Sequence, residues 1–83
     1  MPDDIDPRRS APIYVQLAAI LREQIRAGRI EPDTALPSKR ELQERYHVSP
    51  GTSERAFKIL RDEGLVRTVP GRGVFVVEVL PER

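Results

Sequence analysis

The chain has 83 residues, enough for one small domain that buries only about 60% of the surface its unfolded form exposes, which leaves little room for a catalytic cleft. Its 14 basic and 13 acidic residues give a formal net charge of +1, so the overall charge does not indicate a nucleic-acid partner and any basic surface must be local. The lack of cysteine excludes disulfides, thiolate metal sites and cysteine nucleophiles, and no apolar run approaches the roughly 20 residues that cross a bilayer, so we expect a cytoplasmic protein with no membrane contact.

The first eleven residues predict a loose segment. Residues 1–10 (MPDDIDPRRS) hold two prolines, three aspartates and one isolated isoleucine. This is too little apolar surface to offset the entropy lost on ordering them. We therefore expect residues 1–11 to be a flexible N-terminal arm with mobile Arg8 and Arg9 side chains.

Residues 12–28 predict an amphipathic helix. Apolar residues recur at helical spacing, namely Tyr14, Leu17, Ala18, Ile20, Leu21 and Ile25. Gln16 falls on the opposite, polar face and is expected to meet solvent. Pro12 suits a first helical turn because its missing N–H is not needed there, and Gly28 can adopt the left-handed conformation that ends a helix.

Two short helices are expected after a connector. Residues 29–37 contain two prolines and no helical period, which indicates a connector with a short strand around Ala35 and Leu36. Ser38 stands three residues before Glu41, the capping-box spacing that opens a helix. The next break, at residues 47–50, leads to another start signal.

Ser49 is a good N-cap and Pro50 a good first helical residue, so a third helix is predicted to run to Gly64. Its inward face carries Ser53, Ala56, Phe57 and Leu60, and its outward face carries Gly51, Arg55, Lys58 and Asp62. Two short helices joined this tightly have the spacing of a helix-turn-helix.

Beyond Gly64 the pattern changes to that of strands. Apolar residues dominate 65–69 and 74–77, and the PGRG sequence between them supplies a turn with Arg72 at its tip. A hairpin after a helix-turn-helix is a wing. The predicted fold is mainly α with a small β-hairpin (α+β), a three-helix winged helix-turn-helix over residues 12–77, followed by a tail or the start of a linker over residues 78–83.

These motifs together resemble the N-terminal DNA-binding domain of GntR-type transcription regulators. The resemblance runs from Pro12 to Val77 and rests on PIY-x-Q, LPS-x-R-x-L, VS-x-x-T, EGLV and GRG-x-FV. The proline after VS and the RAF stretch favour the YtrA-like or HutC-like branches. The resemblance implies a third helix in the DNA major groove, a second helix whose start contacts the backbone, and a wing tip in the adjacent minor groove.

General chemistry supports these placements. Side chains near the N-terminus of a helix in the major groove reach base edges, which makes Arg55 the candidate for base reading. Helix N-terminal amides bind phosphate, and Arg72 between two glycines can approach a minor groove closely. The predicted DNA-binding residues are Ser38, Lys39, Arg40, Ser49, Gly51, Thr52, Arg55, Lys58, Gly71, Arg72 and Gly73.

The sequence also departs from the family pattern. Many members have arginine where this chain has Pro50 and Glu54, and an apolar β-branched residue where it has Ser53. Glu54 could accept from a cytosine amino group, pair with Lys58 one turn on, or repel phosphate. Ser53 trims the core where the second and third helices meet.

Each candidate also has a purely structural interpretation. Arg55, Lys58 and Arg61 could belong to a solvated helix face whose salt-bridge partners are Glu54, Asp62 and Glu63. Arg72 could be an ordinary exposed turn residue. Ser38 and Ser49 cap helices whether or not they meet phosphate. His47 is a lone turn histidine without a second ligand, so no metal site is predicted. The remaining aromatic candidates, Tyr14, Tyr46, Phe57 and Phe75, are assigned to the core.

The prediction for function is a DNA-binding transcription regulator, most simply a repressor, with no catalytic residues and no cofactor. Its expected partner is double-stranded operator DNA with a palindromic sequence, bound by a homodimer. A small-molecule effector is expected only if a C-terminal domain exists. The main alternative is a winged helix that serves as a protein-interaction or dimerisation module without specific DNA binding. A further alternative is a winged helix that binds double-stranded RNA or Z-form duplex.

Overall fold

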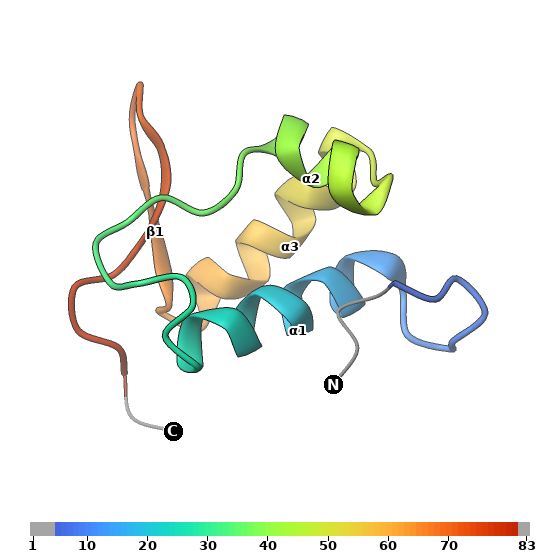
Figure 1. The fold of residues 1–83 in the computed structure, drawn as a ribbon, viewed down its shortest axis with the longest axis horizontal. Helices are drawn as coiled ribbons and strands as arrows, with labels where there is room; N and C mark the ends of the chain where they lie inside the picture. Colours follow the sequence, from blue (N-terminus) through green and yellow to red (C-terminus); the bar gives the residue numbers. More distant parts are fainter. Residues whose placement is uncertain (1–4, 82–83) are drawn as a thin grey trace.

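The computed structural model describes residues 5–81, which form three helices followed by a two-stranded antiparallel sheet (Figure 1). Helix α1 spans Ile13–Arg26, α2 spans Lys39–Tyr46 and α3 spans Pro50–Asp62. Strand β1 spans Val66–Val69 and β2 spans Gly73–Val76. The predicted three-helix winged helix-turn-helix fold is confirmed. None of the helices within residues 5–81 is both long enough and apolar enough to span a membrane.

The core lies where α1 and α2 pack on α3 and where the hairpin closes one end (Figure 1). Leu17 and Leu21 of α1 are fully buried, as are Leu60 of α3 and Leu65 just before β1. Each such side chain contributes about 1.5–3 kcal/mol relative to an exposed one. The apolar stripe of α1 therefore determines how α3 is held.

Both helix starts of the helix-turn-helix are closed by side chains. The Glu41 amide donates to Ser38 Oγ (3.1 Å), and the Ser38 amide donates to Glu41 Oε1 (2.8 Å), which confirms the capping box. Ser49 Oγ accepts from the Thr52 amide at 3.1 Å at the start of α3. Between them His47 adopts a left-handed conformation (φ 59°) that ends α2. These local signals position α3 relative to α2.

The wing is a short hairpin extended by the connector. Val66 pairs with Val76 and Val69 with Gly73, while Gly71 (φ 76°) and Gly73 (φ 127°) supply the positive φ of the turn. Residues 33–36 run beside β2, with backbone hydrogen bonds of 2.8–2.9 Å and a bridge between Ala35 and Phe75. The short strand expected near residue 35 is confirmed as this bridge.

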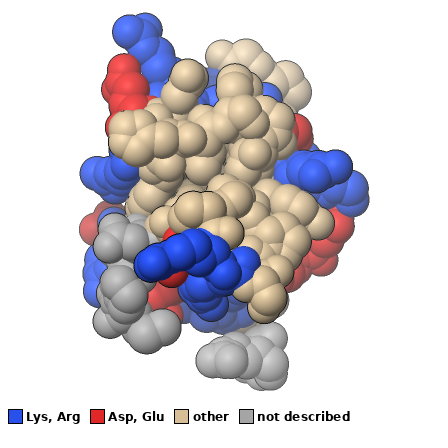
Figure 2. All heavy atoms as spheres, turned by 90° about the vertical axis from the view of Figure 1, so that its right-hand side faces the viewer, with Lys and Arg blue, Asp and Glu red and all other residues tan. Residues whose placement is uncertain are grey.

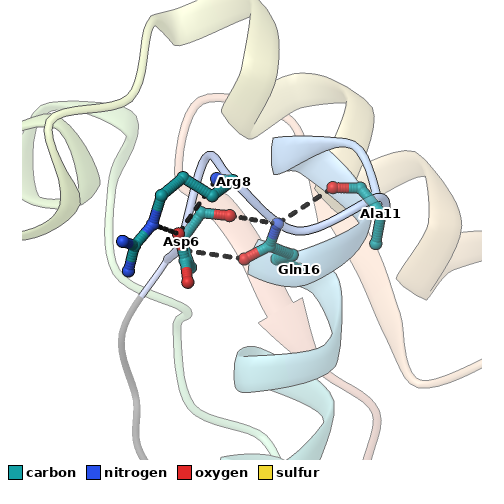
Figure 3. Close-up of polar contacts among 4 residues, drawn as sticks. All are labelled: Asp6, Arg8, Ala11 and Gln16. Carbon is teal, nitrogen blue, oxygen red and sulfur yellow. Dashed lines mark hydrogen bonds and ion pairs between the residues drawn. The ribbon is translucent and has the colours of Figure 1, made fainter.

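Residues 5–11 are folded against α1, unlike the loose arm that their composition predicts. Gln16 is only 3% exposed, so the prediction that it faces solvent is wrong. Its Oε1 accepts from the Asp6 amide, and its Nε2 donates to the carbonyls of Asp6 and Ala11, each at 2.9 Å (Figure 3). Ile5 packs against the core beyond this contact. Residues 1–4 of the expected arm lie outside the described residues.

Candidate nucleic-acid interface

The outward face of α3 presents the residues expected to meet DNA. Gly51, Arg55 and Lys58 are exposed, and Thr52 is half-buried beside the Ser49 cap. Pro50 has no N–H and the Thr52 amide is used by Ser49, so the Gly51 amide is the group that a phosphate at this helix end would meet. The first turn of α3 thus combines a small, exposed surface with a backbone amide that the Ser49 cap does not use.

Arg55 is held from one side by an aromatic ring. Its guanidinium lies 5.1 Å from the centroid of the Tyr14 ring, which belongs to the first turn of α1. A cation over a ring face at this distance is stabilised by about 0.5–1 kcal/mol at an exposed site. Tyr14 was assigned to the core and is half-buried, so sequence reasoning missed its role as a platform for Arg55.

The first turn of α2 carries Ser38, Lys39 and Arg40 at the surface, as expected. Both cations are paired with carboxylates. Lys39 Nζ lies 3.2 Å from Glu54 Oε1 on α3, and Arg40 Nε lies 3.5 Å from Glu44 Oε2 one turn along α2. The Arg40 and Glu44 side chains are largely exposed, and such a pair contributes little, so Arg40 can exchange partners readily.

The wing tip lies across a groove from α2 and α3. The groove is lined by Lys39, Glu54, Arg61 and residues 68–74. Among the described residues, the Arg72 side chain has neither an ion pair nor a hydrogen-bond partner, while its amide closes the turn by donating to the Val69 carbonyl at 2.9 Å. The tip therefore presents an unpaired cation on a turn whose glycine neighbours leave it open.

Glu54 connects three elements through its carboxylate. One oxygen meets Lys39, and the other lies 2.6 Å from Arg61 Nη2. Arg61 in turn donates from Nη1 to Thr68 Oγ1 of β1 at 3.2 Å. The Arg61 guanidinium, and then the Lys39 ammonium, lower the pKa of Glu54, so this carboxylate stays charged at neutral pH.

The ion pairs on α3 exclude one of the alternatives considered for Glu54. Lys58 pairs with Asp62 (3.1 Å) and not with Glu54, so the proposed pairing one turn along the helix is wrong. Arg61 pairs with Glu54, as the structural interpretation of the α3 cations allowed, but its link to the wing through Thr68 was not anticipated. Arg61 stands seven residues after Glu54, two helical turns along the same face.

Charge on the surface is mixed over short distances. Figure 2, which views the right-hand side of Figure 1, shows uncharged surface in the centre with basic and acidic side chains alternating around it. Within residues 5–81 no group of three or more His, Asp or Glu side chains is placed to hold a metal ion. The groove itself is lined by the cations Lys39, Arg61 and Arg72 together with the Glu54 carboxylate, and the cations are groups that can meet phosphate.

Comparison with known proteins gives consistent matches. Residues 13–76 match the family model described as bacterial regulatory proteins of the gntR family. The transcriptional repressor YtrA of Bacillus subtilis is 40% identical over 74 residues, which cover 89% of this chain and 57% of that protein. The chain therefore spans just over half the length of this relative, and 30% of the B. subtilis repressor NagR, to which it is 40% identical.

Solved structures agree with the sequence matches. YtrA from Sulfolobus acidocaldarius, described as a GntR-family transcription factor, superimposes with a TM-score of 0.82 at 35% identity, covering 93% of this chain and 81% of that one. AraR(DBD), solved in complex with operator ORX1, gives a TM-score of 0.79 at 32% identity and covers 87% of this chain and 89% of that one.

Proposed function

Because the chain belongs to the gntR family of bacterial regulatory proteins, we propose that residues 12–77 bind double-stranded DNA sequence-specifically as the DNA-binding domain of a transcription regulator. One observation carries the proposal. The open first turn of α3 is followed by Arg55, which is braced on Tyr14, and a groove beside the same helix is lined by Lys39 of α2 and by the wing tip with its unpaired Arg72. This arrangement offers a helix for a DNA groove and cations from two neighbouring elements.

The binding mode follows from which groups are available. An α-helix fits the major groove, so α3 enters it and Arg55 reads base edges with the amide of Gly51 on a phosphate. Ser38, Lys39 and Arg40 meet the backbone on one side, and Lys58 lies further along the exposed face of α3. On the other side Gly71 and Gly73 let Arg72 enter the minor groove.

Two copies of the chain would bind one operator. A homodimer on a palindromic operator, with half-sites about one turn of DNA apart, follows from how such modules pair with two-fold sites. Repression fits the B. subtilis relative, which is named a repressor. A small-molecule effector would require a further C-terminal domain, and the regulator would act on the nucleoid in the cytoplasm. Residues 78–83 would then form the start of the linker.

Selection from a random duplex library at near-physiological salt, followed by sequencing, tests the proposal. Enrichment of a palindrome establishes specific binding and gives the operator. On that operator Arg55→Ala should lose about 1–3 kcal/mol of affinity and relax one base position, while Arg72→Ala should weaken binding in a salt-dependent way. Arg26→Ala removes the same charge from the exposed end of α1 and serves as the control.

The proposal fails if the folded chain enriches no sequence. It also fails if the Arg55 and Arg26 variants bind alike. Salt-independent capture of a protein partner, sensitive to surface apolar substitutions, would instead favour the protein-interaction function for this winged helix.

A further inference from the structure

Glu54 occupies a place in the groove where a phosphate would be expected. Its two oxygens meet Lys39 Nζ at 3.2 Å and Arg61 Nη2 at 2.6 Å, so one carboxylate bridges a cation of α2 and a cation of α3. The Lys39 and Glu54 side chains are each 46% exposed. The pair is therefore accessible to solvent in the groove, and it is open to exchange with another anion.

The local charge balance shows what this bridge does. Lys39 and Arg61 would together present two positive charges to the groove beside the wing. With the negative charge of Glu54 included, the net charge of the three groups is +1. Each phosphate that a protein neutralises releases condensed counterions from DNA, and this release supplies essentially all non-specific affinity. A carboxylate that already neutralises the cations removes part of this gain, because phosphate must compete with it.

We propose that Glu54 is an internal competitor of DNA phosphate: it occupies Lys39 and Arg61 in the free protein and so weakens the attraction of this groove for duplex of any sequence. The inference rests on the proposed function, since it concerns the strength of the same DNA contact. It assigns to Glu54 the role of limiting non-specific affinity, so that residence on DNA depends more on Arg55 and the wing. Arg61, held to Thr68 at 3.2 Å, becomes a second cation whose contact with DNA is controlled by Glu54.

The test uses a pool of random-sequence duplex as the probe, so the operator need not be known. Glu54→Gln keeps the shape of the side chain and removes its charge. It should raise the affinity for random duplex about eightfold at about 0.1 M monovalent salt and steepen the slope of log K against log salt by about 0.9. Adding Lys39→Met to the Glu54→Gln variant should reverse part of that gain, because one of the released cations is then lost.

Glu63→Gln is the matched control. Glu63 also forms an ion pair of 2.6 Å with an arginine, Arg22, and is similarly exposed, but it lies just past the other end of α3 and ties it to α1. The same change of net charge there should leave the salt slope within experimental error of the original chain. Thermal unfolding by circular dichroism verifies that all variants are folded.

The outcomes separate the two proposals. If the unmodified chain binds no duplex under any salt condition, the proposed function fails. If it binds, but Glu54→Gln leaves affinity and slope unchanged, lowers the affinity, or changes them no more than Glu63→Gln does, the competitor role is wrong. A lowered affinity would show that Glu54 contributes directly to the DNA contact or to the position of the wing.

Discussion

Removing the Ser53 hydroxyl should stabilise the protein, although the residue lies in the centre of its fold. Ser53 is fully buried on the inner face of α3, and its Oγ has no hydrogen-bond partner among the described residues. A buried polar group without a partner costs about 1–3 kcal/mol, because folding strips it of water and gives nothing in return. Ser53→Ala removes that cost while the backbone bond from its amide to the Ser49 carbonyl remains.

Two smaller effects enter the same balance. Alanine is the better helix former by up to about 0.7 kcal/mol. The void left by one oxygen atom costs about 0.3 kcal/mol at about 24 cal/mol per Å³. The net expectation is a gain of about 1–3 kcal/mol, since the desolvation effect is the largest of the three. For a domain of this size that corresponds to a rise in Tm of about 4–8 °C per kcal/mol.

Ser49→Ala supplies a control in which the same chemical change has the opposite sign. Ser49 is exposed, and its Oγ accepts from the Thr52 amide at the start of α3. Its loss should therefore destabilise the fold by about 0.5–2 kcal/mol. Urea unfolding of both variants, followed by far-ultraviolet circular dichroism, measures the two changes on one scale. A destabilised Ser53→Ala variant would refute the reasoning, because the hydroxyl would then have a stabilising partner such as a buried water.

Three further changes have expected results. The pKa values of Glu41, Glu54 and Glu63 are lowered below the ordinary 4.5, chiefly by a hydrogen bond from a capping backbone amide for Glu41 and from an arginine for each of the other two. The unfolded chain therefore binds more protons in acid, so the free energy of unfolding should fall as the pH drops below about 4.5. A series of urea titrations at different pH measures this, and a flat profile would contradict it. Gln16→Ala removes three hydrogen bonds that hold residues 6–11, so it should lower the free energy of unfolding by about 1–3 kcal/mol and speed tryptic cleavage after Arg8 and Arg9. Unchanged cleavage would mean that these bonds do not hold the segment. A Cβ added at Gly73 would meet no atom within 4 Å, but the residue has a φ of 127° that alanine rarely adopts. Gly73→Ala should therefore lower the free energy of unfolding by about 1–3 kcal/mol through backbone strain alone, and a neutral result would mean that the wing relaxes.

The helix starts could be predicted from sequence because each depends on a few neighbouring residues. Ser38 with Glu41, and Ser49 with Pro50, determine where α2 and α3 begin, and both capping hydrogen bonds are present. The strand pattern after Gly64 is local in the same way. Periodicity and capping are short-range properties, so they are written in consecutive residues.

Several features that sequence reasoning missed join segments that lie apart in the sequence. Gln16 is polar and lies on the side of α1 opposite its apolar stripe, but residues 5–11 fold back over it and satisfy both its amide atoms. Nothing in the spacing of α1 indicates this cover. The contact of Arg55 with Tyr14 and the bridge from Lys39 to Glu54 likewise depend on how three helices pack, which no local pattern specifies.

The pairing of these cations determines which groups are available to DNA without displacing a carboxylate. Lys39, Arg40 and Lys58 each have an acidic partner in the free protein, so their contact with phosphate is an exchange of one anion for another. Arg55 is positioned by a neutral ring, and Arg72 has no acidic partner among the described residues, so both keep their full charge for the DNA. Because exchange yields less than new neutralisation, the electrostatic attraction for DNA should depend mainly on Arg55 and Arg72, although they are a minority of the basic residues at the interface.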